Sequence, residues 1–277
     1  MMTVARVVKQ TPRTRPPKGG RRYRMTIAYD GTDFYGWQTQ PAKPTVQGAL
    51  EGALRQLTGE AVRVHSSGRT DTGVHARGQT AHFDLRKPWE AGALQKGLNA
   101  VLPEAVRVSA LRRAADTFHA RYDATGKEYR YSIWNARVGC PLERRQAVHI
   151  RAPLDVAAMR EAAGMLVGTH DFAAFAANPH REMDGTVRTL WRLEVGKRGA
   201  RVTIRAVGDG FLYKMVRSLA GHLLRVGSGA VPAAETRELL ASRRRTARVE
   251  TAAAHGLCLH RVFYGAIPGL PKREQPC

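Results

Sequence analysis

Ser66-Ser67-Gly68-Arg69-Thr70-Asp71-Thr72-Gly73-Val74-His75-Ala76 is the stretch around which the rest of the chain can be arranged. An alternating run at residues 61–65 leads into it and another at 79–84 leads out, which predicts a loop at the end of a sheet. Two glycines bracket the loop, as is typical where a backbone adopts a positive φ or lies close to a ligand. Taken alone, Asp71 is most simply a turn residue that bonds its own backbone. A charged catalytic carboxylate is the alternative, and its support comes from other parts of the chain.

The composition is that of a folded protein with a strong positive charge. The 277 residues include 45 Lys and Arg against 23 Asp and Glu, a formal net charge of +22. Eight of the basic residues and no acidic one fall within residues 1–24, so the remainder still carries +14. A folded body this basic most often binds a polyanion, which favours nucleic acid as the partner over a merely basic composition.

Several functional classes find no support in the sequence. No run of about 18 apolar residues occurs, and the N-terminus has no apolar segment, so neither a membrane span nor a secretory signal is expected. Cys140, Cys258 and Cys277 form neither a disulfide framework nor a zinc pattern, which indicates a cytoplasmic protein. No phosphate-binding glycine motif and no histidine pair at ligand spacing is present, so no cofactor and no metal are expected.

The periodicity divides the chain into four parts. A disordered basic arm is expected at 1–21, an N-terminal domain at 22–124, a C-terminal domain at 125–267 and a tail at 268–277. The expected elements of the N-terminal domain are strands at 22–30, 61–65, 78–84 and 106–111 and helices at 46–57 and 90–101. Those of the C-terminal domain are strands at 127–134, 187–195, 201–207 and 257–264 and helices at 156–167, 212–224 and 233–242.

Both domains therefore have the order β-α-β-β-α-β, with a hairpin turn at Gly196–Gly199 in the second. This predicts an α+β fold of two ferredoxin-like halves with antiparallel sheets and helices on one face. The opposite faces are then free to form a central cleft, and RNA-binding modules of this topology use their open sheet in that way.

One edge of the helix expected at 212–224 carries polar residues at spacing i, i+3, i+4, i+7 and i+11: Lys214, Arg217, Ser218, Gly221 and Arg225. A solvated face is the simple interpretation of this edge. The alternative is that Arg217 points into the cleft and faces Asp71. An Arg close to an Asp favours the ionised carboxylate and fixes its orientation.

Lys127-Glu128-Tyr129-Arg130-Tyr131 alternates charge and ring along an expected strand. Strand geometry places Lys127, Tyr129 and Tyr131 on one face. Core packing of the tyrosines and stacking of a ring on a base are equally open interpretations, and a tyrosine hydroxyl could also transfer a proton.

Two further segments combine aromatic, histidine and arginine side chains. Phe118-His119-Ala120-Arg121-Tyr122 joins the expected halves, and Asn178-Pro179-His180-Arg181-Glu182 precedes the second hairpin. Each could line a positive groove that follows a nucleic-acid backbone, which makes His180 and Arg181 candidate RNA contacts.

Residues 68–76 resemble the catalytic loop of the tRNA pseudouridine synthase A family, with Thr72 in place of the usual Ala. Further segments match in order: Tyr29-Asp30-Gly31, Gly36-Trp37-Gln38, Val46-Gln47, 118–121, 127–131, 168–172, 210–217 and 256–259. The resemblance covers about residues 22–265, and Lys214 and Ser218 stand where the family more usually has His and Asn.

The resemblance implies a pseudouridine synthase fold and a role for each matching residue. Asp71 matches the nucleophilic aspartate, Arg217 the arginine paired with it, and Tyr129 the active-site tyrosine that packs on the target base. Arg69 matches the residue that helps to flip the target nucleotide. A last set matches a stretch that binds tRNA: Phe118, His119, Ala120, Arg121 and Tyr122.

The family isomerises uridine to pseudouridine at positions 38, 39 and 40 of the tRNA anticodon stem-loop, as a homodimer without a cofactor. The resemblance therefore implies tRNA as partner, with no membrane and no DNA involved. Two other functions fit the residues less well: a noncatalytic RNA-binding protein, and a metal-dependent nuclease, which would need clustered carboxylates.

Overall fold

The computed structural model describes residues 15–178 and 185–270. The first half of the chain contains β1 (Arg21–Tyr29), α1 (Val46–Thr58), β2 (His65–Ser66), β3 (His75–Leu85), α2 (Ala91–Val101) and β4 (Val106–Arg113). This is the β-α-β-β-α-β order that the sequence predicts. Helix α1 begins where the Thr45 hydroxyl accepts the Gly48 N–H and ends at Gly59, whose φ of 75° favours glycine.

The second half adds β5 (Gly126–Asn135), β6 (Val148–Ile150), α3 (Val156–Gly164), β7 (Gly168–Asp171), the 3₁₀ turn η1 (Ala173–Phe175), β8 (Val187–Arg198), β9 (Arg201–Gly208), α4 (Met215–Gly227), α5 (Glu235–Ser242), the 3₁₀ turn η3 (Ala254–Gly256) and β10 (Leu257–Phe263). Sequence periodicity does not predict β6, β7, η1 or η3, because elements of three or four residues are too short to show a period.

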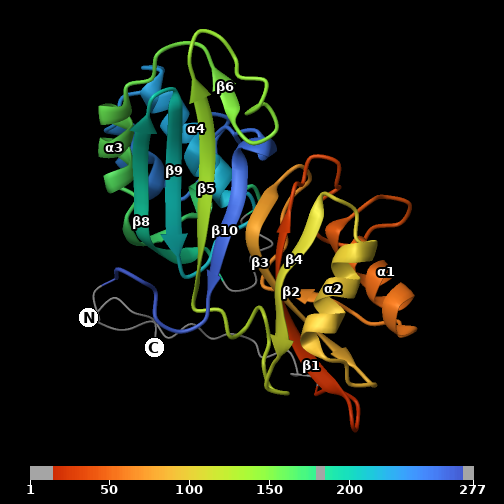
Figure 1. The fold of residues 1–277 in the computed structure, drawn as a ribbon. Helices are drawn as coiled ribbons and strands as arrows, with labels where there is room; N and C mark the ends of the chain where they lie inside the picture. The colour runs from red at the N-terminus through yellow and green to blue at the C-terminus, as the bar shows by residue number, and fades with distance from the viewer. Residues whose placement is uncertain (1–14, 179–184, 271–277) are drawn as a thin grey trace.

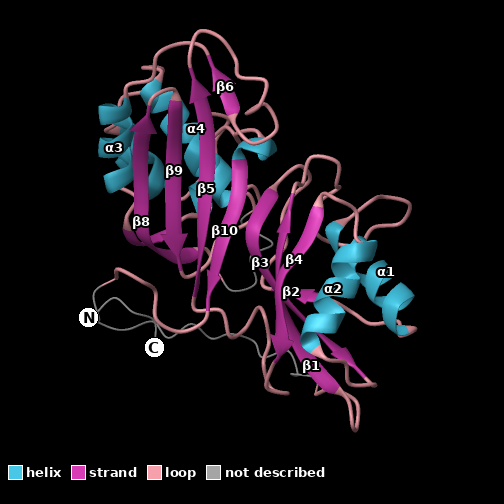
Figure 2. Ribbon diagram, in the orientation of Figure 1, coloured by secondary structure: helices cyan, strands magenta, loops and turns pink. Residues whose placement is uncertain are grey.

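All these strands hydrogen-bond into one sheet of ten strands (Figure 1). The order is β4-β1-β3-β10-β5-β9-β8-β7, with β2 on β3 and β6 on β5. Helices α3 and α4 lie behind β8, β9 and β5 in this view, and α1 and α2 accompany the strands of the first half (Figure 2). The two halves of the sheet meet where β3, at residues 75–85, pairs with β10, at residues 257–263.

The prediction of antiparallel sheets is wrong, because the sheet is mixed. Strand β10 pairs with β3 in parallel, with Cys258 opposite His75 and Leu259 opposite Ala76. Strand β6 is also parallel to β5. The physical reason is that the last strand of the chain lies between the two halves and bonds to β3 on one side and β5 on the other. The ferredoxin-like description of each half stays a prediction.

Of the strand expected at 61–65, His65 alone lies in a strand, as the first residue of β2. The N–H of Val64 donates to the Glu51 carboxylate at 3.0 Å, and its carbonyl accepts the Gln47 amide at 3.1 Å. Side chains of α1 therefore satisfy the backbone groups that a strand partner would have used.

The second-half hairpin turns later than expected, at Gly199 and Ala200. Gly196 pairs with Thr203 inside the ladder, and the last pair is Arg198 with Arg201. Gly199 has a φ of 58°, which suits the first central position of a two-residue turn.

The expected domain limits are only partly within the described residues. Residues 1–14 of the predicted arm and 271–277 of the predicted tail lie outside them, and Arg21 already belongs to β1. The division at residues 124 and 125 falls between β4 and β5 and stays a prediction. One hydrophobic cluster includes side chains of both halves, such as Tyr23 and Leu219.

We expect the buried ion pair of Arg22 to be a strong determinant of stability. The guanidinium, 1% exposed, donates to both oxygens of Asp84 at 2.8 Å and to the Phe118 carbonyl at 2.8 Å. Replacing Arg22 by Met leaves the carboxylate without these donors, so chemical denaturation should show a loss of about 3–5 kcal/mol.

Arg63→Ala is the matched control. The Arg63 side chain is 53% exposed, and its Nε lies 3.7 Å from the Glu51 carboxylate. The control should change the free energy of unfolding by less than about 1 kcal/mol. Equal effects of the two substitutions would contradict the prediction.

Candidate active site

Asp71 lies in the loop between β2 and β3, and hydrogen bonds fix the backbone on both sides of it. The Thr70 carbonyl accepts the Trp37 N–H at 3.0 Å. The Asp71 carbonyl accepts the Val74 N–H at 3.1 Å and closes a turn in which Gly73 has a φ of 76°. A positive φ at the third residue of such a turn favours glycine, so the bracket at Gly73 has the predicted cause.

Gly68, the other bracket, has no positive φ, and the nearest atom to a side chain there would be the end of a flexible lysine. A Cβ atom there would lie 2.7 Å from the Lys127 ammonium nitrogen. That ammonium donates to the Ser67 carbonyl at 2.9 Å, and the Gln79 amide donates to the Gly68 carbonyl at 2.8 Å. A lysine from β5 thus contacts the loop that carries Asp71.

The structure places Arg217 of α4 directly against Asp71. Nη1 donates to Oδ2 at 2.9 Å, and the two side chains are 14% and 24% exposed. Nε of the same guanidinium donates to the Ala252 carbonyl at 2.8 Å. Because it is bonded in two directions, the guanidinium can hold the carboxylate in one orientation.

The predicted polar edge of α4 is covered by protein rather than by solvent. Ser218 is buried and accepts a hydrogen bond from Arg245 at 2.8 Å, and a Cβ on Gly221 would lie 2.2 Å from the Glu250 carbonyl oxygen. Lys214 does not share this edge, since it precedes the helix with a left-handed φ of 58°. The solvated-face interpretation is therefore wrong for most of the edge.

Tyr129 forms a wall of the site next to Asp71. It is 8% exposed, and its ring packs edge-on against Phe211 with centroids 5.1 Å apart. Burial raises the pKa of the Tyr129 hydroxyl well above its usual range, and the neighbouring Tyr29 and Asp71 add to the effect. The hydroxyl is therefore neutral at physiological pH.

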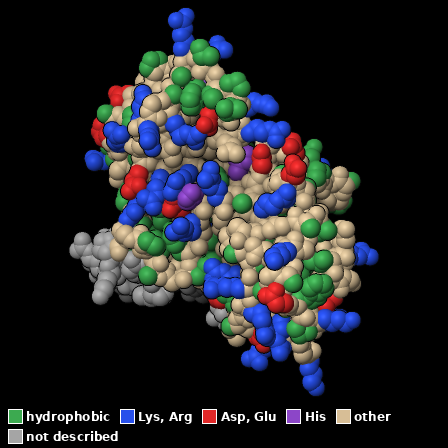
Figure 3. All heavy atoms as spheres, in the orientation of Figure 1, with side chains coloured by type: hydrophobic (Ala, Val, Ile, Leu, Met, Phe, Trp, Pro, Cys, Tyr) green, Lys and Arg blue, Asp and Glu red, His purple; other side chains and the backbone are tan. Residues whose placement is uncertain are grey.

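These groups line one open cavity of about 730 Å³ between the halves. Its basic lining residues come from both halves: Arg63, Arg69, Arg121, Lys127, Lys214 and Arg217. Among the described lining residues, Asp71 is the one carboxylate. Positive side chains also spread over the face shown in Figure 3, including a group over β8, β9 and β5. A single anionic group in a basic cavity suits a polyanionic ligand.

The structure separates the members of the predicted 118–122 stretch. His119, Arg121 and Tyr122 line the cavity, whereas Phe118 and Ala120 do not. The Phe118 ring packs on that of Tyr264, with ring centroids 5.3 Å apart, and Ala120 is fully buried. Their predicted contact with RNA has no counterpart in this arrangement.

Three histidine rings support the cavity rim. The His82 ring stacks on that of His65, with ring centroids 5.1 Å apart, and packs edge-on against that of His119, with centroids 4.7 Å apart. Burial, followed by the charges of His119 and Arg22, lowers the pKa of His82 to about 3. A neutral His82 accepts the Ala120 N–H at 3.1 Å, which fixes the chain just before Arg121.

Other predicted residues have simpler outcomes. Arg69 is exposed at the cavity, two residues before Asp71. His180 and Arg181 lie outside the described residues.

Sequence reasoning missed Phe211 and Tyr213 as cavity residues. Tyr213 is 50% exposed and lies under the Lys214 ammonium at 5.1 Å. The available signal was the aromatic pair directly before the helical stripe, at Gly210-Phe211-Leu212-Tyr213.

The 15–178 and 185–270 ranges contain no helix with the length and apolar character needed to cross a membrane. Over the same ranges, no three histidine, cysteine, aspartate or glutamate side chains converge in a way that could hold a metal ion.

Comparison with known proteins gives a consistent family. The family model for tRNA pseudouridine synthase matches residues 25–123 and 162–265. A tRNA pseudouridine synthase A of Brevibacillus brevis is 45% identical over 244 residues, covering 88% of this chain and 100% of the relative. Those of Solidesulfovibrio magneticus and Halalkalibacterium halodurans are 48% and 43% identical, covering 90% and 86% of this chain and 94% and 90% of theirs.

These matches, together with an α/β fold that has one mixed sheet and a basic cavity, define an RNA-modifying isomerase. The chain belongs to the tRNA pseudouridine synthase family.

Proposed function

We propose that this chain converts uridine to pseudouridine at positions 38, 39 and 40 of the tRNA anticodon stem-loop, with Asp71 as the nucleophilic carboxylate and without a cofactor. The observation that carries the proposal is the Asp71–Arg217 pair at 2.9 Å inside a basic cavity. The chain's family supplies the reaction, and the resemblance of residues 68–76 supplies the role of Asp71.

The reaction breaks the bond between uracil N1 and ribose C1′, turns the detached base and joins its C5 to C1′. The proton on C5 is lost and N1 gains one, so the product has the composition of the substrate. A carboxylate near C1′ can serve by adding to that carbon or by taking a proton from the sugar. Arg217 keeps Asp71 oriented throughout, because its second bond is to the Ala252 backbone.

The target base must leave its helix before Asp71 can approach the sugar. Unstacking costs a few kcal/mol, and an inserted side chain lowers that cost. Arg69 is exposed at the cavity and is assigned this role. His119, Arg121 and Tyr122 line the same cavity and are assigned contacts to the tRNA backbone.

Two remaining expectations are part of the proposal. The resemblance implies a homodimer, which light scattering of the purified protein would test. A cytoplasmic location agrees with the scattered cysteines and with tRNA as the substrate.

The test is incubation of the purified protein with unmodified tRNA in buffer containing EDTA, followed by mapping of pseudouridine. Pseudouridine at one or more of positions 38, 39 and 40 is the expected result. Binding without any new pseudouridine would favour the noncatalytic alternative, and cleaved tRNA in the presence of metal would favour the nuclease.

Tyr129 separates two roles, a lid on the detached uracil and a proton carrier. We expect the lid, because the Tyr129 ring packs edge-on against Phe211 and burial raises the pKa of its hydroxyl, which makes the hydroxyl a poorer proton donor. Tyr129→Phe should then retain activity within about tenfold, since loss of an essential proton-transfer group would cost about 10²–10⁴-fold. Tyr129→Leu removes the ring and should lower activity by about 10²-fold, the scale of a misplaced reactant. Single-turnover rates measure both variants. A Phe variant as slow as the Leu variant would identify the hydroxyl as the essential group.

A further inference from the structure

Arg217 and the catalytic loop are also joined behind the cavity, by the short segment before β10. We name residues 252–256 the bridge segment. The Ala252 N–H donates to the Arg217 carbonyl at 3.0 Å, and the Ala252 carbonyl accepts Arg217 Nε at 2.8 Å. The Ala253 carbonyl accepts the Tyr131 hydroxyl at 3.0 Å. The bridge segment thus holds the guanidinium and is itself held by β5.

The bridge segment packs closely against both sides of the site. A Cβ on Gly256 would lie 2.7 Å from the Tyr131 ring, so only glycine fits there without movement. A Cβ on Gly73 would lie 3.4 Å from Ala254 Cβ. A displacement of the bridge segment would therefore move both the Arg217 guanidinium and the turn that carries Asp71.

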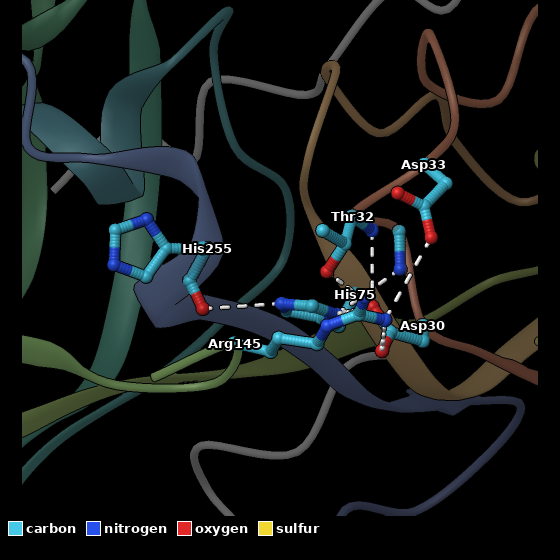
Figure 4. Close-up of polar contacts among 7 residues, drawn as sticks. Asp30, Thr32, Asp33, His75, Arg145 and His255 are labelled. Atoms are coloured by element: carbon cyan, nitrogen blue, oxygen red, sulfur yellow. Dashed lines mark hydrogen bonds and ion pairs between the residues drawn. The ribbon is translucent and has the colours of Figure 1, made fainter. Parts of the chain in front are cut away.

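His75 makes the polar link between the bridge segment and the catalytic loop (Figure 4). The ring is 5% exposed, and Nε2 lies 3.1 Å from the His255 carbonyl oxygen. A carbonyl can only accept, which assigns the proton in this bond to Nε2. Nδ1 is then free to accept the Gly31 N–H at 3.0 Å. The ring therefore has a backbone partner on each side, four residues after Asp71.

Asp30 and Arg145 lie on the Nδ1 side of the ring. Asp30 Oδ1 lies 3.1 Å from His75 Nδ1 and also accepts the Thr32 N–H and hydroxyl. Arg145 Nη1 is 3.7 Å from both Asp30 and Asp33, and Arg145 is 50% exposed, so these two exposed pairs contribute little. The Nε2 bond to the His255 carbonyl is the contact that reaches the bridge segment.

We propose that His75 is a positioning residue: its Nε2–H fixes the bridge segment against the catalytic loop and so sets how Arg217 meets Asp71. The inference rests on the proposed function of these two residues. His75 lies outside the described lining of the catalytic cavity and faces a second hollow of about 470 Å³. Its loss should therefore lower the rate of the chemical step and leave tRNA binding unchanged.

Two substitutions separate the two nitrogens of the ring. His75→Gln keeps an amide donor near the position of Nε2, whereas His75→Asn keeps an acceptor near Nδ1 but cannot contact His255. A misplacement of about 1 Å can cost about 10²-fold in rate. We expect His75→Asn to lower kcat by about 30-fold with KM within about threefold, and His75→Gln to restore most of that loss.

Matched controls and a second measurement accompany these rates. Arg145→Ala removes the exposed contact beside the ring, and His149→Asn removes an exposed ring whose Nε2 also meets a backbone carbonyl, that of Ala136. Both should keep kcat within about twofold. Hydrogen exchange of peptides 68–76 and 250–257 should quicken in His75→Asn and stay near wild type in His75→Gln.

Equal rates for the Asn and Gln variants, or a loss confined to KM, would overturn the proposal. So would a fall in kcat no larger than the loss of folded protein measured by thermal melting. If His75→Asn is recovered only unfolded, Gly256→Ala replaces it, because it displaces the bridge segment from Tyr131. Wild-type kcat in Gly256→Ala would then overturn the proposal.

The failure of this inference is distinct from the failure of the proposed function. An active Asp71→Asn enzyme would remove the proposed function itself, whatever His75 does. An inactive Asp71→Asn enzyme beside a His75→Asn enzyme with wild-type kcat would reject the positioning role alone.

Discussion

Asp71→Asn should abolish pseudouridine formation while leaving tRNA binding almost intact. The substitution keeps the size of the side chain and its place beside Arg217 Nη1, but it removes the anionic oxygen that we propose acts at the sugar. Loss of a nucleophile typically lowers turnover by at least about 10⁴-fold. Affinity should stay within about tenfold of wild type, because many phosphate contacts dominate such an interface.

Single-turnover conversion and filter binding on the same tRNA measure the two quantities. Salt must be identical in both, since phosphate-dominated affinity depends steeply on it. The acid at position 33 gives a control, because Asp33 is 73% exposed and its ion pair with Arg145 spans 3.7 Å. Asp33→Asn should keep wild-type turnover. Turnover surviving in Asp71→Asn would refute the assignment of the nucleophile.

Arg217→Ala should lower turnover by about 10²–10³-fold, which is the usual effect of losing one preorganised electrostatic partner. The tRNA affinity should change by less than about fivefold. The guanidinium bonds to Asp71 through Nη1 and to the Ala252 carbonyl through Nε. Both the orientation of the carboxylate and the anchoring of the bridge segment are lost together. Lysine has no planar fork and cannot make both bonds, so Arg217→Lys should recover only part of the rate.

Arg225→Ala on the same helix is the control for Arg217. Arg225 pairs with Glu250 at 3.0 Å, and that glutamate is 65% exposed. This variant should keep turnover within about twofold of wild type, because exposed pairs contribute little. A proportional loss of turnover and affinity in Arg217→Ala would make Arg217 a phosphate contact instead.

Local patterns predicted the parts of the site that a single stretch of chain can build. Gly73 allows the positive φ of the turn after Asp71, and that requirement is visible in the sequence. The strand period places Lys127 and Tyr129 on one face, and both line the cavity. The helix edge left Arg217 open between a solvated face and a partner of Asp71, and the family resemblance favoured the partner; the structure places it against Asp71.

Features that depend on distant partners were not predictable in this way. The Gln47 and Glu51 side chains replace a strand partner for Val64, which no period reveals. Phe118 was expected to line a groove for RNA but packs on Tyr264, because composition does not distinguish a ring in a core from a ring on RNA. The parallel pairing of β10 with β3 joins residues more than 180 positions apart, and only the folded chain shows it.

That pairing has a consequence for how the protein is made. Synthesis proceeds from the N-terminus, so β3 emerges from the ribosome long before Leu257–Phe263 exists. Until then β3 lacks its partner at His75 and Ala76, and an unpaired strand edge is the kind of surface that invites association with other chains. The bridge segment precedes β10, so the Nε partner of Arg217 is also made only after residue 251. A nascent chain would thus hold Arg217 in place only once residues 252–263 have been synthesised.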